Sequence, residues 1–132
     1  MADLIYTPLY AALFALLLFA LSVRTLLLRR RFKVGVGPGQ EPLLERAMRV
    51  HANFCEYVPV TLLLVFFLEL LTGPGWWIHS LCAALLLGRL LHAWGVSQVK
   101  EDYRYRIVGM AVTFAVILVS AAGILVSYSP WI

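Results

Sequence analysis

The chain has 132 residues, of which 62% are hydrophobic and 14% are charged, and its mean hydropathy is +0.87. This composition is too apolar for a soluble domain and fits a single small integral membrane domain over residues 1–132. The formal net charge of +4 does not indicate nucleic acid as a partner, because nucleic-acid binding requires a basic face on a soluble module.

Four apolar stretches are long enough to cross a bilayer as helices. The first covers residues 4–28 and is followed by a basic triplet, Arg29 to Arg31. The second covers residues 42–71 and has an amphipathic, charged beginning. The third and fourth cover residues 76–98 and 105–128. The sequence therefore predicts an all-α fold, an integral membrane four-helix bundle.

The basic residues are distributed unevenly along the chain. All eleven lie in or beside the two connections that follow the first and third helices: Arg24, Arg29, Arg30, Arg31, Lys33, Arg46, Arg49, Arg89, Lys100, Arg104 and Arg106. By the positive-inside rule, these two connections are predicted to be cytosolic and both termini to lie outside.

The second helix carries a polar stripe into a segment bound for lipid. The stripe spans roughly 80° of arc on a helix that advances about 100° per residue, and it consists of Glu45, Arg49, Asn53 and Glu56, flanked by Arg46 and Tyr57. Ionisable residues are costly in such a segment and mark functional sites. Because Glu56 lies about 10.5 Å along the helix from Arg49, it requires a partner from another helix, another subunit or a ligand.

The other three helices add polar residues near their predicted cytosolic ends: Arg29 or Arg30, Arg89 and His92, Tyr103 and Arg106. Arg104 points about 200° away from Arg106 on the helix, so both cannot face one site. Arg106 is predicted to face inward, because Met110 and Thr113 follow it on the same face. Together with the stripe, these residues would form a cationic pocket for a small ligand with carboxylates and an ammonium group. The alternative is that the arginines and Glu56 only hold the helices together.

Four further residues receive structural interpretations. Glu69 is predicted to be solvated near the outer interface, and His51, about 150° from the stripe, to make a hydrogen bond in helix packing. Cys55 and Cys82 lie in predicted spans without the context of a disulfide or a metal site, so no metal is expected. Both are interpreted as small core residues.

The second helix also carries a recognisable motif. Its residues Arg49-x-His51-x-Asn53-x-x-Glu56-Tyr57-x-Pro59, preceded by Glu45-Arg46, resemble the signature of the membrane-associated proteins in eicosanoid and glutathione metabolism. The Arg89-Leu-Leu-His92 and Arg106-x-x-Gly109 elements extend the likeness over almost the whole chain. The short inner loop resembles the bacterial branch of the family, which implies a multi-pass protein of the bacterial inner membrane.

The resemblance implies a homotrimer that binds glutathione, as a co-substrate, between adjacent subunits and activates it toward a lipophilic electrophile that arrives through the bilayer. Arg106 would lie beside the sulfur, and Arg29 or Arg30 would close the mouth of the site. The guanidinium of Arg106 beside the sulfur would stabilise the thiolate, since a free thiol with a pKa of about 8.5 is mostly protonated at neutral pH. The glutathione-binding residues would be Arg49, Asn53, Glu56, Tyr57, Arg89 and His92, with Tyr103 as a further candidate.

One position departs from the family pattern. Val96 stands where well-studied members carry a tyrosine, and the sequence leaves open whether Tyr103 replaces it. The first hypothesis is a membrane glutathione S-transferase or peroxidase. The alternative is a non-catalytic lipid-binding or scaffold protein of the same fold. A small multidrug transporter fits less well, because its ion-coupling glutamate lies in the first helix, which here is apolar from residue 4 to 22.

Overall fold

The computed structural model describes residues 4–129, and these form four long helices. They are α1 (Tyr6–Phe32), α2 (Pro42–Thr72), α3 (Trp76–Ser97) and α4 (Tyr103–Tyr128). Each is long and apolar enough to cross a membrane. The prediction of an all-α, four-helix membrane bundle is confirmed.

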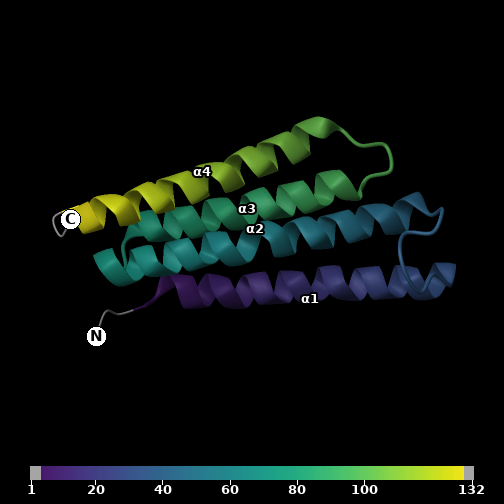
Figure 1. The fold of residues 1–132 in the computed structure, drawn as a ribbon, viewed down its shortest axis with the longest axis horizontal. Helices are drawn as coiled ribbons and strands as arrows, with labels where there is room; N and C mark the ends of the chain where they lie inside the picture. Colours follow the sequence, from purple (N-terminus) through teal and green to yellow (C-terminus); the bar gives the residue numbers. More distant parts are fainter. Residues whose placement is uncertain (1–3, 130–132) are drawn as a thin grey trace.

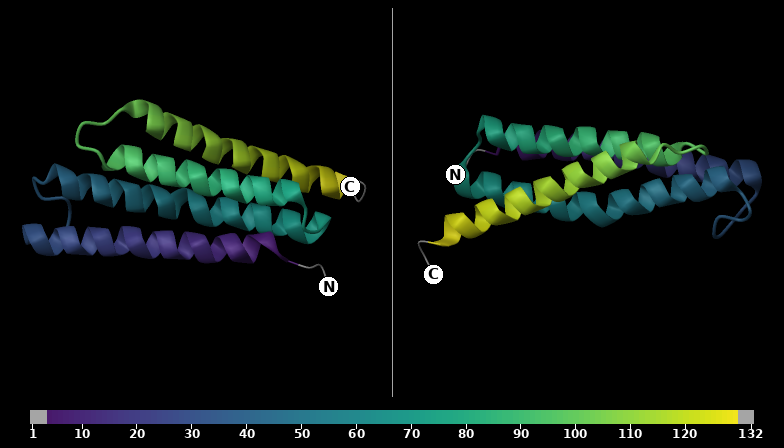
Figure 2. Two further views of the ribbon diagram at one scale, coloured as in Figure 1. Left: turned by 180° about the vertical axis from the view of Figure 1, so that it is seen from behind. Right: turned by 90° about the horizontal axis from the view of Figure 1, so that it is seen from above.

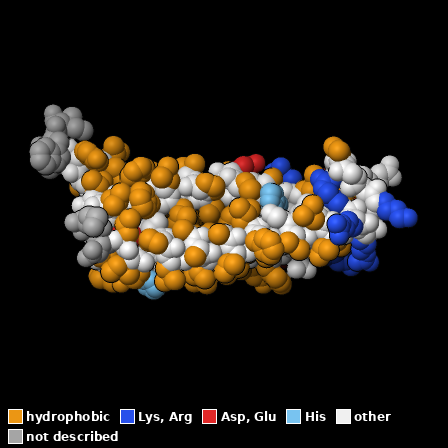
Figure 3. All heavy atoms as spheres, turned by 90° about the horizontal axis from the view of Figure 1, so that it is seen from below, with side chains coloured by type: hydrophobic (Ala, Val, Ile, Leu, Met, Phe, Trp, Pro, Cys, Tyr) orange, Lys and Arg blue, Asp and Glu red, His pale blue; other side chains and the backbone are white. Residues whose placement is uncertain are grey.

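The helices run antiparallel to their chain neighbours, with α2 and α3 in the middle of the bundle (Figure 1). Helix α4 crosses the others obliquely and packs on both α3 and α2 (Figure 2). The ends of the described chain and the α2–α3 connection lie at one end of the bundle, and the other two connections lie at the opposite end. Lys and Arg side chains gather at that second end (Figure 3), which we call the basic end.

Helix boundaries follow from local chemistry. Helix α1 continues through its basic triplet and stops at Lys33, whose left-handed backbone (φ 56°) lets the amides of Lys33 and Val34 bond back to the carbonyls of Arg30 and Arg29. Helix α2 begins with Pro42 in its first turn, where a missing N–H costs nothing.

Helices α3 and α4 approach closely because glycines face each other across their contact. A Cβ built on Gly109 would lie 2.6 Å from the carbonyl oxygen of Gly88 and 2.7 Å from Cβ of His92. A Cβ on Gly95 would lie 2.7 Å from Cβ of Tyr105. Small residues of this kind let helix backbones approach in a membrane, where packing replaces the hydrophobic effect as the main attraction.

The prediction that Glu69 is solvated is wrong. The Glu69 side chain is fully buried, and its carboxylate accepts hydrogen bonds from the backbone amides of Ile5, Tyr6 and Thr7 at 2.8–3.0 Å. The Thr7 hydroxyl also donates to it. Because Ile5 offers no side-chain cap, Glu69 supplies from α2 the acceptor that the first amides of α1 lack.

The structural interpretations of His51 and Cys82 are confirmed, and that of Cys55 is not. His51 makes the expected packing hydrogen bond, with its Nε2 3.0 Å from Oγ of Ser22 on α1. Cys82 is buried in the core as expected, but Cys55 is exposed, because it lies on the outward face of α2. The core-residue interpretation is therefore wrong for Cys55.

Candidate functional site

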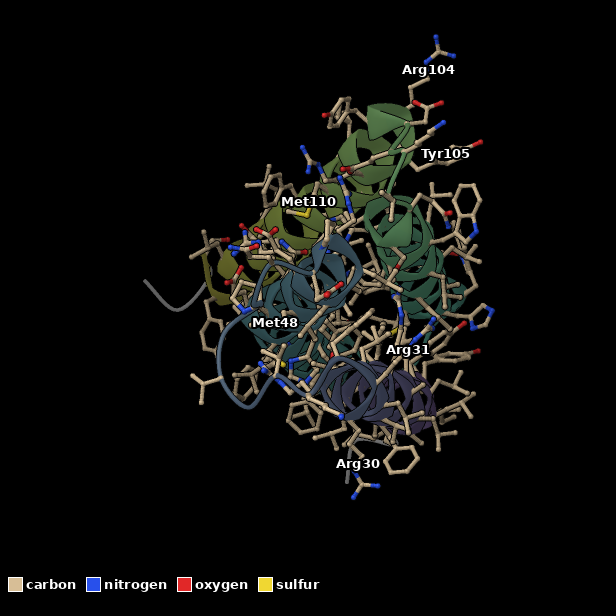
Figure 4. All side chains as sticks on the ribbon, turned by 90° about the vertical axis from the view of Figure 1, so that its right-hand side faces the viewer. Arg30, Arg31, Met48, Arg104, Tyr105 and Met110 are labelled. Atoms are coloured by element: carbon tan, nitrogen blue, oxygen red, sulfur yellow. The ribbon has the colours of Figure 1, made fainter. Side chains whose placement is uncertain are left out.

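A pocket of about 360 Å³ opens at the basic end between α2, the end of α3 and the start of α4. Figure 4 views the molecule from this end. The size falls in the range of small-molecule sites, about 300–1,000 Å³. Its lining combines charged and apolar side chains: Pro42, Glu45, Arg46, Arg49, Asn53, His92, Val96, Val99, Glu101 and Arg106.

Four of the residues predicted for the ligand site meet in this pocket. Arg49 and Asn53 come from α2, His92 from α3 and Arg106 from α4. Arg104 points away from the bundle (Figure 4), as expected from its position on the helix. The structure therefore brings together residues that are up to 57 positions apart in the chain, and it leaves their cationic groups accessible from the basic end.

Arg89 lies behind the pocket wall and is only 1% exposed. Its Nη2 donates to Oδ1 of Asn53 at 2.6 Å and lies 3.3 Å from Nδ1 of His92, and its Nη1 is 3.5 Å from the sulfur of Met110. The ion pairs within residues 4–129 do not include it, and its Nε has no hydrogen-bond partner. Arg89 thus fixes the orientation of Asn53 and His92 and places an uncompensated positive charge behind them.

Glu101 is a pocket residue that sequence reasoning missed. It lies in the short connection between α3 and α4, and its side chain is 3% exposed. Its carboxylate is 2.8 Å from Nη1 of Arg46 and 3.4 Å from Nη1 of Arg106. Arg46 also donates to the carbonyl of Val96 at 3.1 Å.

These contacts tie α2, α4 and the α3–α4 connection together at the pocket. The available signal for Glu101 is an acidic residue in a short connection, between Lys100 and Asp102 and close to Arg104 and Arg106. That position alone does not distinguish a buried carboxylate from a solvated one. Arg46 and Arg106 therefore do two things: their ion pairs with Glu101 hold the helices together, and both side chains also line the pocket.

Two predicted residues of α2 lie outside this pocket. Glu56 is exposed on the outer face of the helix, one turn beyond Asn53. Tyr57 packs edge-on against Phe114 of α4, with 5.5 Å between ring centroids. Within one chain, Glu56 and Tyr57 therefore do not share a cavity with Arg49 and Arg106.

Arg29 and Arg30 do not close the mouth of the pocket within one chain. Both line a separate shallow hollow beside Lys33 and Gly35. The guanidinium of Arg29 is held there by the connection itself, because its Nη1 donates to the carbonyl of Gly37 at 2.9 Å. Within one chain, Arg29 therefore stabilises the α1–α2 connection.

Val96 occupies the position at which the family pattern has a tyrosine. Val96 is 6% exposed and lines the pocket, so the side chain at this position faces the interior of the pocket. Tyr103 is outside the pocket lining and touches it only through Arg106, whose guanidinium carbon lies 5.2 Å from the tyrosine ring centroid. Tyr103 therefore contacts Arg106 by a cation–π interaction and does not occupy the space that a tyrosine at position 96 would fill.

The pocket has the chemistry to bind an anionic, flexible molecule. Its lining contains three arginines and two glutamates, and one of the glutamates is already engaged by Arg46 and Arg106. Arg49 has no carboxylate partner among the ion pairs of the described chain. Arginine forks bind carboxylates with paired hydrogen bonds, and Asn53 and His92 add polar groups of fixed orientation.

Comparison with known proteins gives a consistent result. The MAPEG family model matches residues 7–126. The chain is 36% identical to the inner membrane protein YecN of Escherichia coli K12 over 125 residues, which cover 95% of this chain and 93% of that protein. YecN of Escherichia coli O6:H1 strain CFT073 matches with the same identity and coverage. The chain belongs to the MAPEG family, the membrane proteins of eicosanoid and glutathione metabolism.

Proposed function

We propose that this protein is a membrane glutathione transferase or peroxidase, which binds glutathione at the basic end of the bundle and activates its thiol toward lipophilic electrophiles. The observation that carries the proposal is the convergence of Arg49, Asn53, His92 and Arg106 from three helices on one pocket. Membership in the MAPEG family supports glutathione as the co-substrate.

In this proposal the charged and the neutral residues of the pocket have different roles. Arg49 and Arg106 bind anionic groups, and Asn53 donates or accepts hydrogen bonds in an orientation fixed by Arg89. In this proposal Arg106 lies beside the sulfur and stabilises the thiolate, which is the nucleophilic form. Lowering the thiol pKa by two units would require about 2.7 kcal/mol of differential stabilisation. The thiolate then attacks the electrophile, and a sulfur–carbon bond forms as the leaving group departs with its electron pair.

The pocket position suits an electrophile that arrives from the membrane. Val96 and Val99 provide apolar surface within the pocket. Ile107, the neighbour of Arg106 on α4, is 62% exposed on the outside of the bundle. A lipophilic molecule dissolved in the bilayer would therefore reach the sulfur along the apolar surface of α4, while glutathione enters from the aqueous side.

A trimer would cover a face of α2 that one chain leaves open. Exposed or half-buried residues follow each other on this face at intervals of three and four positions: Glu45, Arg49, Asn53, Glu56, Val60, Leu63 and Phe67. This spacing is typical of a helix that packs against another helix. A second subunit there would also give Glu56 the partner that one chain does not supply, and we assign it the ammonium group of glutathione bound at the subunit boundary.

The proposed location is the inner membrane, with the basic end on the cytosolic side. The positive-inside rule and the similarity to the inner membrane protein YecN support this assignment. It can be checked with the exposed Val36, in the α1–α2 connection. In a variant lacking both native cysteines, Val36→Cys should resist an impermeant thiol reagent applied to sealed cells, and Pro74→Cys should react. The reverse pattern would invert the topology.

The function is tested by mixing the purified, detergent-solubilised protein with glutathione in a stopped-flow instrument and recording thiolate absorbance. We expect thiolate formation by the wild type and its loss in Arg106→Ala. Arg104→Ala is the matched control, because it removes the same group from the same helix at a position that points away from the pocket (Figure 4). Binding of glutathione should be measured in parallel by calorimetry.

Each outcome of this experiment supports or contradicts the proposed function. Thiolate formation that survives in Arg104→Ala and is absent in Arg106→Ala establishes the site and the role of Arg106. If the wild type neither binds glutathione nor forms thiolate, the transferase proposal fails. The non-catalytic scaffold then explains the ion pairs of Glu101 with Arg46 and Arg106, which would serve only to hold the helices together.

A further inference from the structure

Two arginines of α1 face away from the pocket, toward α3. Nη1 of Arg24 donates to Oγ of Ser97, the last residue of α3. Arg31 lies seven residues after Arg24, which is close to two full turns and places both on the same face of α1. In Figure 4, Arg31 projects to the side of α1 that faces α3, whereas Arg30 projects to the opposite side.

Neither arginine has a carboxylate partner. The ion pairs of residues 4–129 belong to Glu101 with Arg46 and Arg106. The partner of Arg24 is a neutral hydroxyl, which itself donates to the carbonyl of Ala93. Because a guanidinium carries five N–H donors, Arg24 keeps donors that this contact does not use. Arg31 contacts the Phe32 ring, with 5.5 Å from the guanidinium carbon to the ring centroid.

The depth of these charges matters. Arg24 precedes the end of α1 by eight residues, or about 12 Å along the helix axis, so it lies on the membrane side of the aqueous connection. Below it, the same faces of the two helices are apolar, with Leu17 on α1 and Leu90, 44% exposed, on α3. Arg24 at this level, above an apolar surface and with Arg31 about 10.5 Å nearer the connection, calls for an anionic partner that also has a hydrocarbon part.

We propose that the surface where α1 packs on α3 at the basic end binds an anionic phospholipid, with its phosphate held by Arg24 and Arg31. Arginine forks match the geometry of phosphate oxygens, and basic sites between membrane helices bind such headgroups on the cytosolic side. Ser97 orients Arg24, and the acyl chains lie along Leu17 and Leu90. This surface lies on the opposite side of α3 from α4 and the pocket (Figure 1), so the proposed lipid site does not depend on the glutathione proposal.

The test uses the whole protein in detergent. Phosphatidylglycerol and phosphatidylcholine with identical acyl chains are titrated separately, and bound lipid is counted by native mass spectrometry alongside the thermal unfolding midpoint. We expect the wild type to prefer phosphatidylglycerol and to be stabilised by it. Arg24→Gln and Arg31→Gln should each weaken binding of phosphatidylglycerol about fivefold, the effect of one basic residue near a charged lipid surface.

Arg30→Gln is the matched control, because it removes the same charge from the neighbouring position on the other side of α1. It should leave the preference for phosphatidylglycerol intact. Glycerol phosphate, which has the headgroup chemistry without acyl chains, should not compete. If Arg24→Gln fails to fold, Arg31→Gln carries the test alone, since Arg31 is exposed.

Three results would overturn the proposal. The first is equal binding of the two lipids by the wild type. The second is an equal loss in Arg30→Gln and Arg31→Gln, which would mean that general charge near the membrane decides the affinity. The third is competition by glycerol phosphate at the same concentration, which would make this a site for soluble phosphate compounds.

Discussion

Glu69 shows how one side chain can govern the start of a helix far away in the chain. The first amides of a helix have no acceptor within the helix, and in an apolar environment an unpaired amide costs several kcal/mol. Glu69 accepts hydrogen bonds from three of these amides, 62–64 residues away, and from the Thr7 hydroxyl. The negative charge also lies at the positive end of the α1 dipole.

Removal of this carboxylate should weaken the end of the bundle opposite the basic end. We expect Glu69→Ala to lower the free energy of unfolding by about 3 kcal/mol, because three backbone amides lose their acceptor at once. Glu69→Gln keeps one acceptor oxygen and should lose less. Equilibrium unfolding in mixed detergent micelles measures both.

Glu45→Gln is the control for this comparison, because it neutralises an exposed carboxylate of the same helix. It should leave stability nearly unchanged. An equal loss in Glu45→Gln and Glu69→Gln would mean that net charge, and not the capping contact, is responsible.

At the scale of elements, the contact between α3 and α4 depends on glycine. Gly109 lies where these two helices come nearest, beside Gly88 and His92. Since His92 and Arg106 line the pocket from opposite helices, the spacing of α3 and α4 also sets the width of the site. Packing and the candidate site are therefore coupled through Gly109.

The change Gly109→Ala should force the two helices apart. The new Cβ would meet the Gly88 carbonyl and the His92 backbone, which cannot move without the helix, and overpacking of this kind costs about 1–3 kcal/mol. Glutathione affinity should fall with stability, because His92 is displaced. Thermal unfolding and calorimetry on the same sample would record the two effects.

Gly123→Ala is the matched change on the same helix. Its Cβ would meet only the terminal methyl groups of Leu68 at 3.0–3.4 Å. This side chain can shift, and alanine gains helix propensity of about 1 kcal/mol over glycine. We expect a small net effect on stability and none on glutathione affinity. A loss equal to that of Gly109→Ala would argue against a special role for the α3–α4 contact.

For the whole molecule, the proposed trimer depends on the open face of α2. Leu63 lies on this face and lines an apolar groove of about 410 Å³ between α1 and α2. An apolar groove beside a row of polar residues offers a second chain both shape and hydrogen bonds. The proposed trimer would use this surface.

Leu63→Trp should therefore disrupt assembly. The wild type in detergent should have three times the chain mass of 14.8 kDa by light scattering corrected for bound detergent, and the variant should shift to smaller species. Leu87→Trp makes the same change on α3, where Leu87 is also exposed, and should keep the trimer. A wild type that is monomeric at all protein concentrations would contradict the proposal.

Much of this protein could be predicted from sequence because its strongest signals are local. Long apolar runs predict membrane helices, and helical spacing alone separates Arg106 from Arg104. The convergence of Arg49, Asn53, His92 and Arg106 was predicted from the same periodicity and the family motif, and the structure places them around one pocket. Their role in glutathione binding stays a prediction.

The prediction for Glu69 was wrong because it depended on contacts between helices. Position near a helix end favoured a solvated Glu69, but only the packing of α1 on α2 brings the unpaired amides of α1 to it. Within one chain, the path of the α1–α2 connection likewise presents carbonyls that bind Arg29. The predicted role of Arg29 or Arg30 at a site between subunits stays a prediction.

The number of helices, their membrane character and the end at which positive charge gathers can all be read from hydropathy and charge counted along the chain. The pairing of charges depends on the folded structure, since an ion pair such as Glu101 with Arg46 joins residues 55 positions apart. The partner of a polar group in an apolar medium is chosen by proximity in space. That proximity is set by helix packing and by the course of the connections, which hydropathy and charge along the chain do not record.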